Sequence, residues 1–298
     1  MSVCVLGSIN LDHFMLVDTL PRAGETLAAT RTFQAPGGKG ANQAIAAART
    51  GIPTRMIGAV GDDAAGRVLR DYLGSNGLDV SDVAILESQL TGAAYVTLSK
   101  AGENHIIVAP NANARLALPA GNVMHDARVA LAQLETPVDI VARFFAHAAA
   151  RGAICVLNAA PAVAAARTLF EGVDVLIVNQ VELAAFLSSD SVVSTPDDAA
   201  AARRLLVRPD QIAIVTLGSA GAVLVGRDRL IHVPAVVVRE VVDTTGAGDC
   251  FCGVIAALLS DGREWDDILK IANQAAAMCI QHEGAVSAKP ANGIAVPA

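Results

Sequence analysis

The sequence predicts an α/β fold, in which helices flank a doubly wound, mainly parallel sheet that carries a small β-lid. Short runs rich in Val, Ile and Leu alternate along the chain with Ala-rich runs of helical length. This alternation is typical of parallel sheets that are covered by helices on both faces. Polar and glycine-rich motifs follow several of the strand-like runs. Because ligands of such sheets bind beyond the carboxyl ends of the strands, these motifs indicate a binding site.

The expected strands are short and continuously apolar, as buried parallel strands are. They cover residues 3–9, 54–60, 153–157, 173–178 and 211–217. The expected helices lie between them, and Gly51 and Gly152 stand where helix C-caps would. These helices cover residues 41–49, 64–73, 138–150, 181–187 and 197–206. A further hairpin-like pair of strands is expected within residues 222–238.

Two segments, 13–35 and 93–109, interrupt the alternation of strands and helices. The first has extended stretches around a Pro-Arg-Ala-Gly turn, and the second reads as a hairpin with strands 94–98 and 105–108. Both segments begin and end on the side of the sheet where the carboxyl ends of the strands lie, so we expect them to form a β-lid over the site. Two unrelated surface hairpins are the alternative. The expected nucleotide- and substrate-binding core comprises residues 1–12, 36–92 and 110–298.

The composition excludes several classes of partner. The net charge is −7 and no cluster of Lys and Arg occurs, which argues against nucleic acid. No apolar run reaches the length that spans a bilayer, and the strand-like start has no basic region typical of a signal peptide. The cysteines, 5 in number, are scattered, and Cys250 and Cys252 would point to different faces of a helix. We therefore expect buried thiols and a cytoplasmic protein that acts away from membranes.

The most informative motif is residues 243–249, Asp-Thr-Thr-Gly-Ala-Gly-Asp, which the apolar run 250–259 follows. It reads as a strand end, a tight turn and a helix whose first turn carries Asp249. Helix N-termini present unpaired N–H groups that bind anions. A carboxylate beside such an anion hole can take a proton from a hydroxyl while the N–H groups stabilise a transferring group. The alternative is that Asp249 merely caps the helix behind a glycine turn.

Two further motifs suit a polyol ligand. Asn10 and Asp12 are two apart after the first strand, so in an extended segment they point to the same side and could hold neighbouring hydroxyls. Residues 37–43, Gly-Gly-Lys-Gly-Ala-Asn-Gln, open a helix without the spacing of a Walker A loop. Paired glycines allow close backbone approach, and the Lys and Asn supply donors. The alternatives are a turn-forming Asn and Asp, and a glycine turn that merely enters a helix.

Three motifs follow other strands. Glu135 ends the strand-like run before Pro137. Asn179 ends a strand and Glu182 lies one turn into the next helix, so the pair could hold a hydrated Mg²⁺ near phosphates, or could simply form a capping box. Residues 216–221, Thr-Leu-Gly-Ser-Ala-Gly, form a strand end and glycine turn suited to a nucleotide. Each motif is weak alone, and their joint placement at strand ends carries the prediction.

In order and wording, these motifs resemble those of the ribokinase-like (PfkB) carbohydrate kinases over essentially the whole chain. The wording of residues 37–43, of Gln-Leu-Glu before Pro137, and of residues 158–162 is most similar to the ribose-phosphorylating members, although those usually have Asn-Pro-Ala-Pro where this chain has Asn-Ala-Ala-Pro. The resemblance implies an ATP-dependent kinase that phosphorylates the hydroxymethyl group of D-ribose to give ribose 5-phosphate. A deoxyribose, fructose or nucleoside kinase and a non-catalytic sugar-binding relative are the alternatives.

The resemblance also implies roles for individual residues. Asp249 would be the general base, beside an anion hole formed by Gly246, Ala247 and Gly248. The sugar would be held or surrounded by Asn10, Asp12, Gly38, Lys39, Gly40, Ala41, Asn42 and Glu135. The nucleotide site would comprise Asn179, Thr216, Gly218, Ser219, Gly221, Gly248 and Asn273.

Two cations and a dimer complete the expectation. Glu182 would help to place Mg²⁺ indirectly, and an activating K⁺ would be held by a loop of residues that act mostly through carbonyls: Asp243, Thr245, Cys279, His282 and Gly284. The last position of this loop, usually Ser in the family, aligns with Ala288, although Ser287 is adjacent. The exposed β face of the lid is a natural contact for a homodimer.

Overall fold

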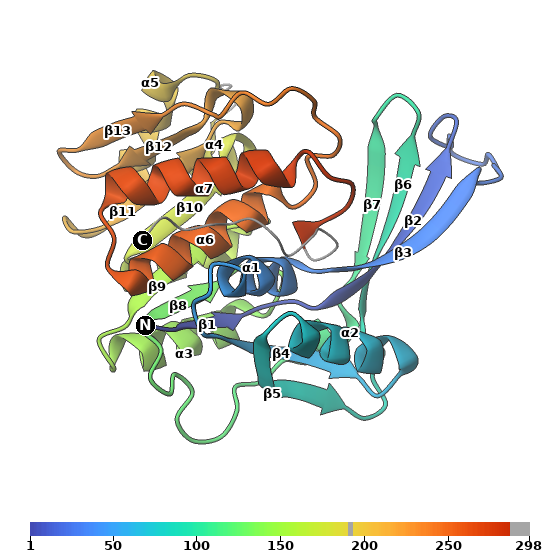
Figure 1. Cartoon of the computed structure of the whole chain (residues 1–298), viewed down its shortest axis with the longest axis horizontal. Helices are drawn as coiled ribbons and strands as arrows, with labels where there is room; N and C mark the ends of the chain where they lie inside the picture. Colours follow the sequence, from blue (N-terminus) through green and yellow to red (C-terminus); the bar gives the residue numbers. More distant parts are fainter. Residues whose placement is uncertain (190–192, 287–298) are drawn as a thin grey trace.

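Nine strands form the central sheet of the computed structural model, which describes residues 1–189 and 193–286 (Figure 1). Their order is β13 (Leu230–Val233), β12 (Ala222–Val225), β11 (Ile212–Thr216), β10 (Val175–Asn179), β9 (Ile154–Asn158), β8 (Val129–Ala132), β1 (Val3–Leu6), β4 (Thr54–Gly61) and β5 (Leu78–Leu86). All pairs from β11 to β5 are parallel, and β12 and β13 add an antiparallel edge. The predicted doubly wound, mainly parallel sheet is confirmed.

Helices cover both faces of this sheet because successive side chains of each strand point to opposite sides. Val3 and Val5 of β1 belong to a core shared with α1 (Lys39–Ala48), α2 (Ala64–Ser75), α6 (Ala247–Asp261) and α7 (Trp265–Cys279). Cys4 and Leu6 belong to a second core, shared with α3 (Val138–Ala149), α4 (Gln180–Leu187) and the 3-10 helix Ala164–Gly172. The chain therefore has two hydrophobic layers with the sheet between them.

One expected helix is only partly α-helical. Residues 197–206 form a short helix α5 (Pro196–Ala199) that continues as the 3-10 helix Ala200–Leu205. Ala199, Ala202 and Leu205 are all buried, and they are spaced by three residues. A helix with three residues per turn keeps that spacing on one face, so the tighter winding buries all three side chains. The strand β5 and the helix α7 were not among the expected elements.

A second sheet of four strands projects from one side of the molecule (Figure 1). Its order is β3 (Arg31–Gly37), β2 (Asn10–Val17), β6 (Gly92–Ser99) and β7 (Asn104–Ala109). The predicted hairpin of 94–98 with 105–108 is present as β6 and β7. The sheet also takes in residues 10–12, 36–37 and 92, which the prediction assigned to the core, because Asn10 already pairs with both Gly37 and Gly92.

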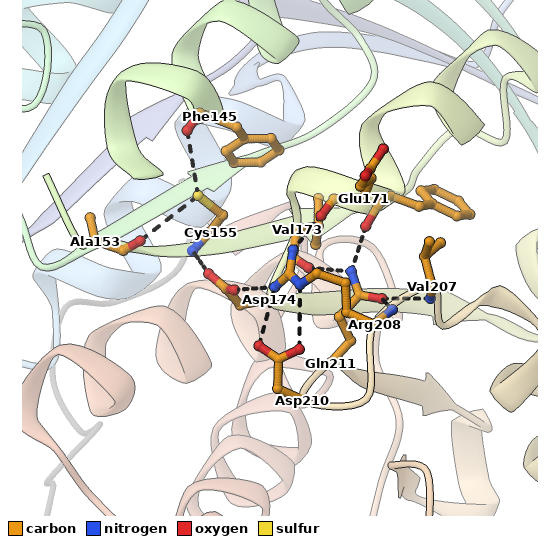
Figure 2. A network of polar contacts seen from close by, with 11 residues as sticks. Phe145, Ala153, Cys155, Glu171, Val173, Asp174, Val207, Arg208, Asp210 and Gln211 are labelled. Carbon is orange, nitrogen blue, oxygen red and sulfur yellow. Dashed lines mark hydrogen bonds and ion pairs between the residues drawn. The ribbon is translucent and has the colours of Figure 1, made fainter. Parts of the chain in front are cut away.

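The amino ends of the central strands are tied together by a polar network (Figure 2). Asp174, just before β10, accepts a hydrogen bond from the backbone N–H of Cys155 at 2.7 Å and pairs with Arg208 at 2.7 Å. The side-chain amide of Gln211 donates to the carbonyls of Phe170 and Val173 at 2.5 and 2.6 Å. This edge is occupied by structural contacts, and the polar motifs follow the strands at the opposite edge. In residues 1–189 and 193–286, no helix has the length and apolar character needed to cross a membrane.

Candidate active site

The candidate site lies where α1 and α6 begin, beyond the carboxyl ends of β1 and β8. The chain order changes direction between these two strands, which is where ligands bind in open α/β sheets. The two helices pack closely because Gly253 of α6 has no side chain. A Cβ at this position would lie 2.3 Å from the carbonyl oxygen of Gln43 and 2.7 Å from the Cβ of Ala46, both on α1. This close packing brings the first turns of the two helices together.

Asp249 is held by two side-chain amides from α1. Its Oδ2 accepts a hydrogen bond from Nδ2 of Asn42 at 3.0 Å, and its Oδ1 accepts one from Nε2 of Gln43 at 2.9 Å. Asp249 is 8% exposed. Gly246 occupies the N-cap position of α6, and no side chain caps the helix there. The carboxylate therefore faces α1 and the site, which the capping alternative does not explain.

The turn before Asp249 presents free N–H groups to a small open space. Gly246 is left-handed with φ 77°, and a Cβ there would lie 2.8 Å from the backbone nitrogen of Val286. The N–H of Ala247 donates to the carbonyl of Thr244 at 3.2 Å. Within the described part of the chain, the N–H groups of Gly248 and Asp249 have no acceptor. A Cβ at Gly248 would meet no atom within 4 Å, so this turn has both the donors and the room for an anion.

A cavity of about 220 Å³ joins this turn to the ends of β10 and β11. Its lining includes Lys39, Asn179, Glu182 and Asp249. The negative charge of Asp249 is the main cause that raises the pKa of Lys39, with smaller contributions from Glu135 and Glu182, while burial acts in the opposite direction. Lys39 therefore keeps its positive charge beside the carboxylates, where an anionic group would meet it.

Glu182 and Asn179 form the capping box that the sequence allowed. The backbone N–H of Asn179 donates to Glu182 Oε2 at 2.8 Å, and the N–H of Glu182 donates to Asn179 Oδ1 at 2.8 Å. Burial raises the pKa of Glu182, and the hydrogen bond from Asn179 opposes this. Since Glu182 also lines the cavity, capping and a role at the site are compatible.

The residues predicted to hold a polyol converge around the start of α1. Oε2 of Glu135 accepts hydrogen bonds from the Ser8 hydroxyl and, at 3.1 Å, from the backbone N–H of Lys39. Gly38 has φ 90°, and a Cβ there would lie 2.8 Å from the carbonyl oxygen of Ser8. The glycine thus lets the start of α1 approach the end of β1, and Gly40, Ala41 and Asn42 follow in the first turn of α1.

Among the residues predicted to hold the sugar, two oxygens are buried without a partner in the described part of the chain. They are Oδ1 of Asp12 and Oδ1 of Asn42. Burial is the main cause that raises the pKa of Asp12 from 3.8 to about 7, and the negative charges of Glu135 and Asp249 contribute to this rise. Buried polar atoms without partners are costly, so these oxygens are strong candidates to bind the hydroxyl groups of a ligand.

A second cavity of about 470 Å³ lies on the other side of the glycine turn. It contains the predicted nucleotide residues Thr216, Gly218, Ser219, Gly221, Gly248 and Asn273. The side-chain amide of Asn273 donates to the carbonyls of Val233 and Pro234 at 3.0 and 3.3 Å, which holds the segment after β13 against α7. Thr216 and Gly248 line both cavities, so the two are neighbours.

The rest of the second cavity is apolar and was not predicted. Its wall is formed by Val236, Val237, Val238, Val241, Phe251 and Ile280. The sequence offered a signal, because the stretch remains rich in valine past the end of β13. In the structure part of it is exposed, with Val237 at 95%. An exposed apolar wall of this kind suits the face of an aromatic base.

The predicted cation loop has two arms that meet at Asp243. Its Oδ1 accepts a hydrogen bond from the backbone N–H of Thr245 at 2.8 Å, and its Oδ2 accepts one from the N–H of Gly284 at 2.8 Å. The carbonyl of Cys279 accepts from the N–H of His282 at 3.3 Å. The predicted residues are therefore neighbours, and the Asp243 carboxylate also accepts a hydrogen bond within its own turn. Ser287 and Ala288 lie outside the described residues.

The comparison with known proteins identifies the family. The model of the pfkB family carbohydrate kinases matches residues 1–292. The chain belongs to the pfkB family of carbohydrate kinases. Ribokinase from Haemophilus influenzae is 32% identical over 296 residues, which cover 97% of this chain and 95% of that protein.

Solved structures support the same assignment. The structure of Arabidopsis thaliana ribokinase complexed with ribose and ATP has a TM-score of 0.87 and 29% identity, and the match covers 98% of this chain and 96% of that one. The structure of ribokinase from Cryptococcus neoformans in complex with ADP has a TM-score of 0.86 and 29% identity, covering 98% and 97%. The resemblance to the PfkB family is confirmed.

Four polar residues that lie at or behind the site were not predicted as site residues from the sequence. Asn113 is 1% exposed, accepts from the backbone N–H of Ile9 at 3.0 Å, and donates to Oδ1 of Asn10 at 2.8 Å. Gln43, Gln133 and Asn158 lie in motifs that the sequence had already singled out, and they form a buried amide network behind Asp249. The only sequence signal for Asn113 is that it follows the lid hairpin within three residues of a Pro.

Proposed function

We propose that this pfkB-family kinase transfers the γ-phosphoryl group of ATP to the hydroxymethyl group of D-ribose, giving ribose 5-phosphate and ADP. One observation carries the proposal. Asp249 stands between a polar pocket with unpartnered acceptors and a cavity with an apolar wall, beside a turn with free N–H groups. A base, an anion site and two ligand pockets in this order match a transfer between a sugar and a nucleotide.

The chemistry requires one proton transfer and one phosphoryl transfer. The Asp249 carboxylate takes the proton of the hydroxymethyl group, whose oxygen forms a bond to the γ-phosphorus as the bond to the ADP oxygen breaks. The N–H groups at Gly248 and Asp249 and the Lys39 ammonium stabilise the negative charge of the transferring group. Asn42 and Gln43 hold the base in place.

The choice of ribose rests on the polar pocket and on the relatives. Asp12, Asn42 and Glu135 offer acceptors at the start of α1, and two of their oxygens lack partners among the described residues, which suits a ligand with several hydroxyls. The relatives cited above are named ribokinases, and one of their structures is described as holding ribose and ATP. Asn10 would also contact the sugar, and a hydrogen bond from Asn113 to its Oδ1 fixes the orientation of its side chain.

Mg²⁺ would accompany ATP. Glu182 lines the cavity beside Asp249, and one of its oxygens is engaged by Asn179 while the other is not. No group of three His, Cys, Asp or Glu side chains suited to a metal occurs in residues 1–189 and 193–286. This fits an ion that is held mainly by phosphates and waters, with Glu182 acting through a water molecule. The ion would neutralise charge on the phosphates.

K⁺ would activate the enzyme through the loop of Asp243, Thr245, Cys279, His282 and Gly284. The Asp243 carboxylate joins the two arms, and the second arm leads to Val286, which packs against Gly246. An ion held by carbonyls of both arms would fix the turn at Gly246 without touching the substrate. Its effect would be to preorganise the anion hole.

The four-stranded sheet would act as a lid over the sugar and as the contact of a homodimer. Asp12 belongs to this sheet, so the sheet reaches the sugar pocket directly. β6 and β7 expose Tyr95, Ile106, Ile107 and Val108, with Ile107 at 71%. A β surface of this kind is unfavourable in water, and a second copy of the lid would cover it.

The test is an assay of product formation. The purified protein with ATP, Mg²⁺ and K⁺ should release ADP only when ribose is present, and phosphorus NMR should show the phosphate on the hydroxymethyl oxygen. Deoxyribose, fructose and nucleosides form the comparison panel. Faster turnover of one of these than of ribose would replace ribose as the substrate, and no turnover of any would leave a non-catalytic binding protein.

A further inference from the structure

A chain of buried amide side chains leads away from Asp249 through Gln43 to Gln133 and Asn158, and of these three amides only Asn158 lines one of the two cavities. Nε2 of Gln43 donates to Asp249 Oδ1 at 2.9 Å and to Asn158 Oδ1 at 3.0 Å. Oε1 of Gln43 accepts from Nε2 of Gln133 at 2.7 Å. Gln43 and Gln133 are both 0% exposed. The chain thus links α1, the end of β8, the end of β9 and the first turn of α6.

These contacts leave the Gln43 amide one orientation. Both hydrogens of Nε2 have acceptors, and the oxygen has a donor. If the amide were reversed, its oxygen would face the Asp249 and Asn158 oxygens, and its nitrogen would face the Gln133 amide. Buried groups with mismatched partners are strongly unfavourable. The Asp249 carboxylate, which can only accept, and the Gln133 amide, which donates to Oε1, together fix the direction of the Gln43 amide, so Gln43 presents an N–H to the base.

A glycine leaves the space that the Gln133 side chain occupies. A Cβ on Gly7 would lie 2.0 Å from Oε1 of Gln133 and 2.7 Å from the Cα of Gly40. Gly7 follows β1 directly, so its missing side chain leaves the slot in which the Gln133 side chain lies. Burying a long polar side chain in such a slot is energetically unfavourable, which indicates that its contact with Gln43 is functional.

We infer that Gln43 is a positioning residue for the base, and that Gln133 acts on the base through Gln43. Gln43 lines neither of the two cavities and is fully buried, so we place it behind the base and not in contact with the substrate. With Asn42 on Oδ2 and Gln43 on Oδ1, the Asp249 carboxylate is held in one rotation, and its remaining lone pairs are available to the hydroxymethyl group of the sugar. This inference rests on the proposed function, in which Asp249 is the base.

The test compares kcat and KM of Gln43→Met, Gln133→Met and the double variant with those of the wild type, using ribose and ATP. Methionine keeps the length of the side chain and removes its hydrogen bonds. Loss of one hydrogen bond to a charged group should lower kcat of Gln43→Met roughly 10- to 100-fold. The KM for ATP should stay within about twofold, because binding of the nucleotide does not use this contact. Gln133→Met should lower kcat less.

The double variant separates positioning from a structural role. Once Gln43 has lost its amide, Gln133 has nothing to orient, so the double variant should have the kcat of Gln43→Met alone. Gln211→Met is the matched control, since Gln211 is also a buried glutamine with amide contacts, at the opposite edge of the sheet (Figure 2). It should lower the melting temperature and leave kcat unchanged.

Each outcome decides the inference. A kcat of Gln43→Met within about twofold of wild type, where the lost hydrogen bond predicts far more, would overturn it. So would losses that multiply in the double variant. If Gln43→Met does not fold, Gln133→Met decides, because it leaves the contact with Asp249 present and should still lower kcat. An inactive wild type would instead reject the proposed function.

Discussion

Replacing Asp12 with Asn should stabilise the ligand-free protein at alkaline pH while weakening sugar binding. Burial, together with the negative charges of Glu135 and Asp249, raises the pKa of this carboxyl from 3.8 to about 7. Because the folded protein binds this proton more tightly than the unfolded chain, the group favours folding below pH 3.8, and this contribution is lost as the pH rises through 7. The whole difference corresponds to about 4 kcal/mol.

The assay is urea unfolding of wild type and Asp12→Asn without ligands, at several pH values from 4 to 8.5. Asn carries no charge at any pH, so the variant should gain stability relative to wild type as the pH rises, by about 1–4 kcal/mol in total. Asp12→Ser, which is also uncharged but differs in shape, should show the same trend, so that differences in packing cancel. The KM for ribose should rise in both variants.

A stability difference that stays constant between pH 4 and pH 8.5 would refute the reasoning, because Asp12 would then not change its protonation with folding in this range. A constant difference together with a raised KM for ribose would mean that Asp12 belongs to the sugar site but that burial of its charge does not destabilise the folded protein. In either case the unpartnered Oδ1 would need another explanation.

Three further predictions concern the anion hole, the cation loop and the lid. Gly248→Ala should fold normally, since its Cβ would meet nothing within 4 Å, but it should lower kcat about 100-fold because the methyl group occupies the space for the anion. Gly246→Ala should instead lower the free energy of unfolding by about 1–3 kcal/mol. Melting curves and kinetics distinguish the two variants. Activity should be higher in K⁺ than in Na⁺ or a bulky organic cation at equal ionic strength, and Asp243→Ala should abolish the difference; equal rates in all three salts would reject the cation site. Ile107→Glu should shift the protein from dimer to monomer in light scattering, and an unchanged mass would remove the lid as the dimer contact.

Much of the fold could be predicted because its buried strands are continuously apolar and alternate with Ala-rich runs of helical length. β9, β10 and β11 are continuous apolar runs, and each shows the signature of a parallel strand. β5 was missed because it is an edge strand in which Asp79, Ser81 and Asp82 interrupt the apolar pattern. The tightening after α5 depends on the packing of Ala202 and Leu205, which propensity does not record.

The candidate site could be predicted where a motif is local. The turn 246–248 and the capping box at Asn179 are made by neighbouring residues, so the sequence carries their chemistry directly. The amide chain could not be predicted, because Gln43 and Asp249 are 206 positions apart and Gln133 and Gln43 are 90 apart. The sequence does not distinguish a buried glutamine from an exposed one, and Gln43 is buried only because α1 packs on α6.

The central claim is that Asp249 acts as the base in the transfer of phosphate to ribose, and Asp249→Asn tests it most directly. The variant keeps the size of the side chain and removes the proton acceptor. With ribose, ATP and Mg²⁺, kcat should fall on the order of 10²–10⁴-fold, while calorimetry should find ATP binding within about threefold of wild type because the nucleotide pocket is unchanged. A variant that keeps more than about half of the wild-type kcat, where loss of a general base costs at least about 100-fold, would contradict the account.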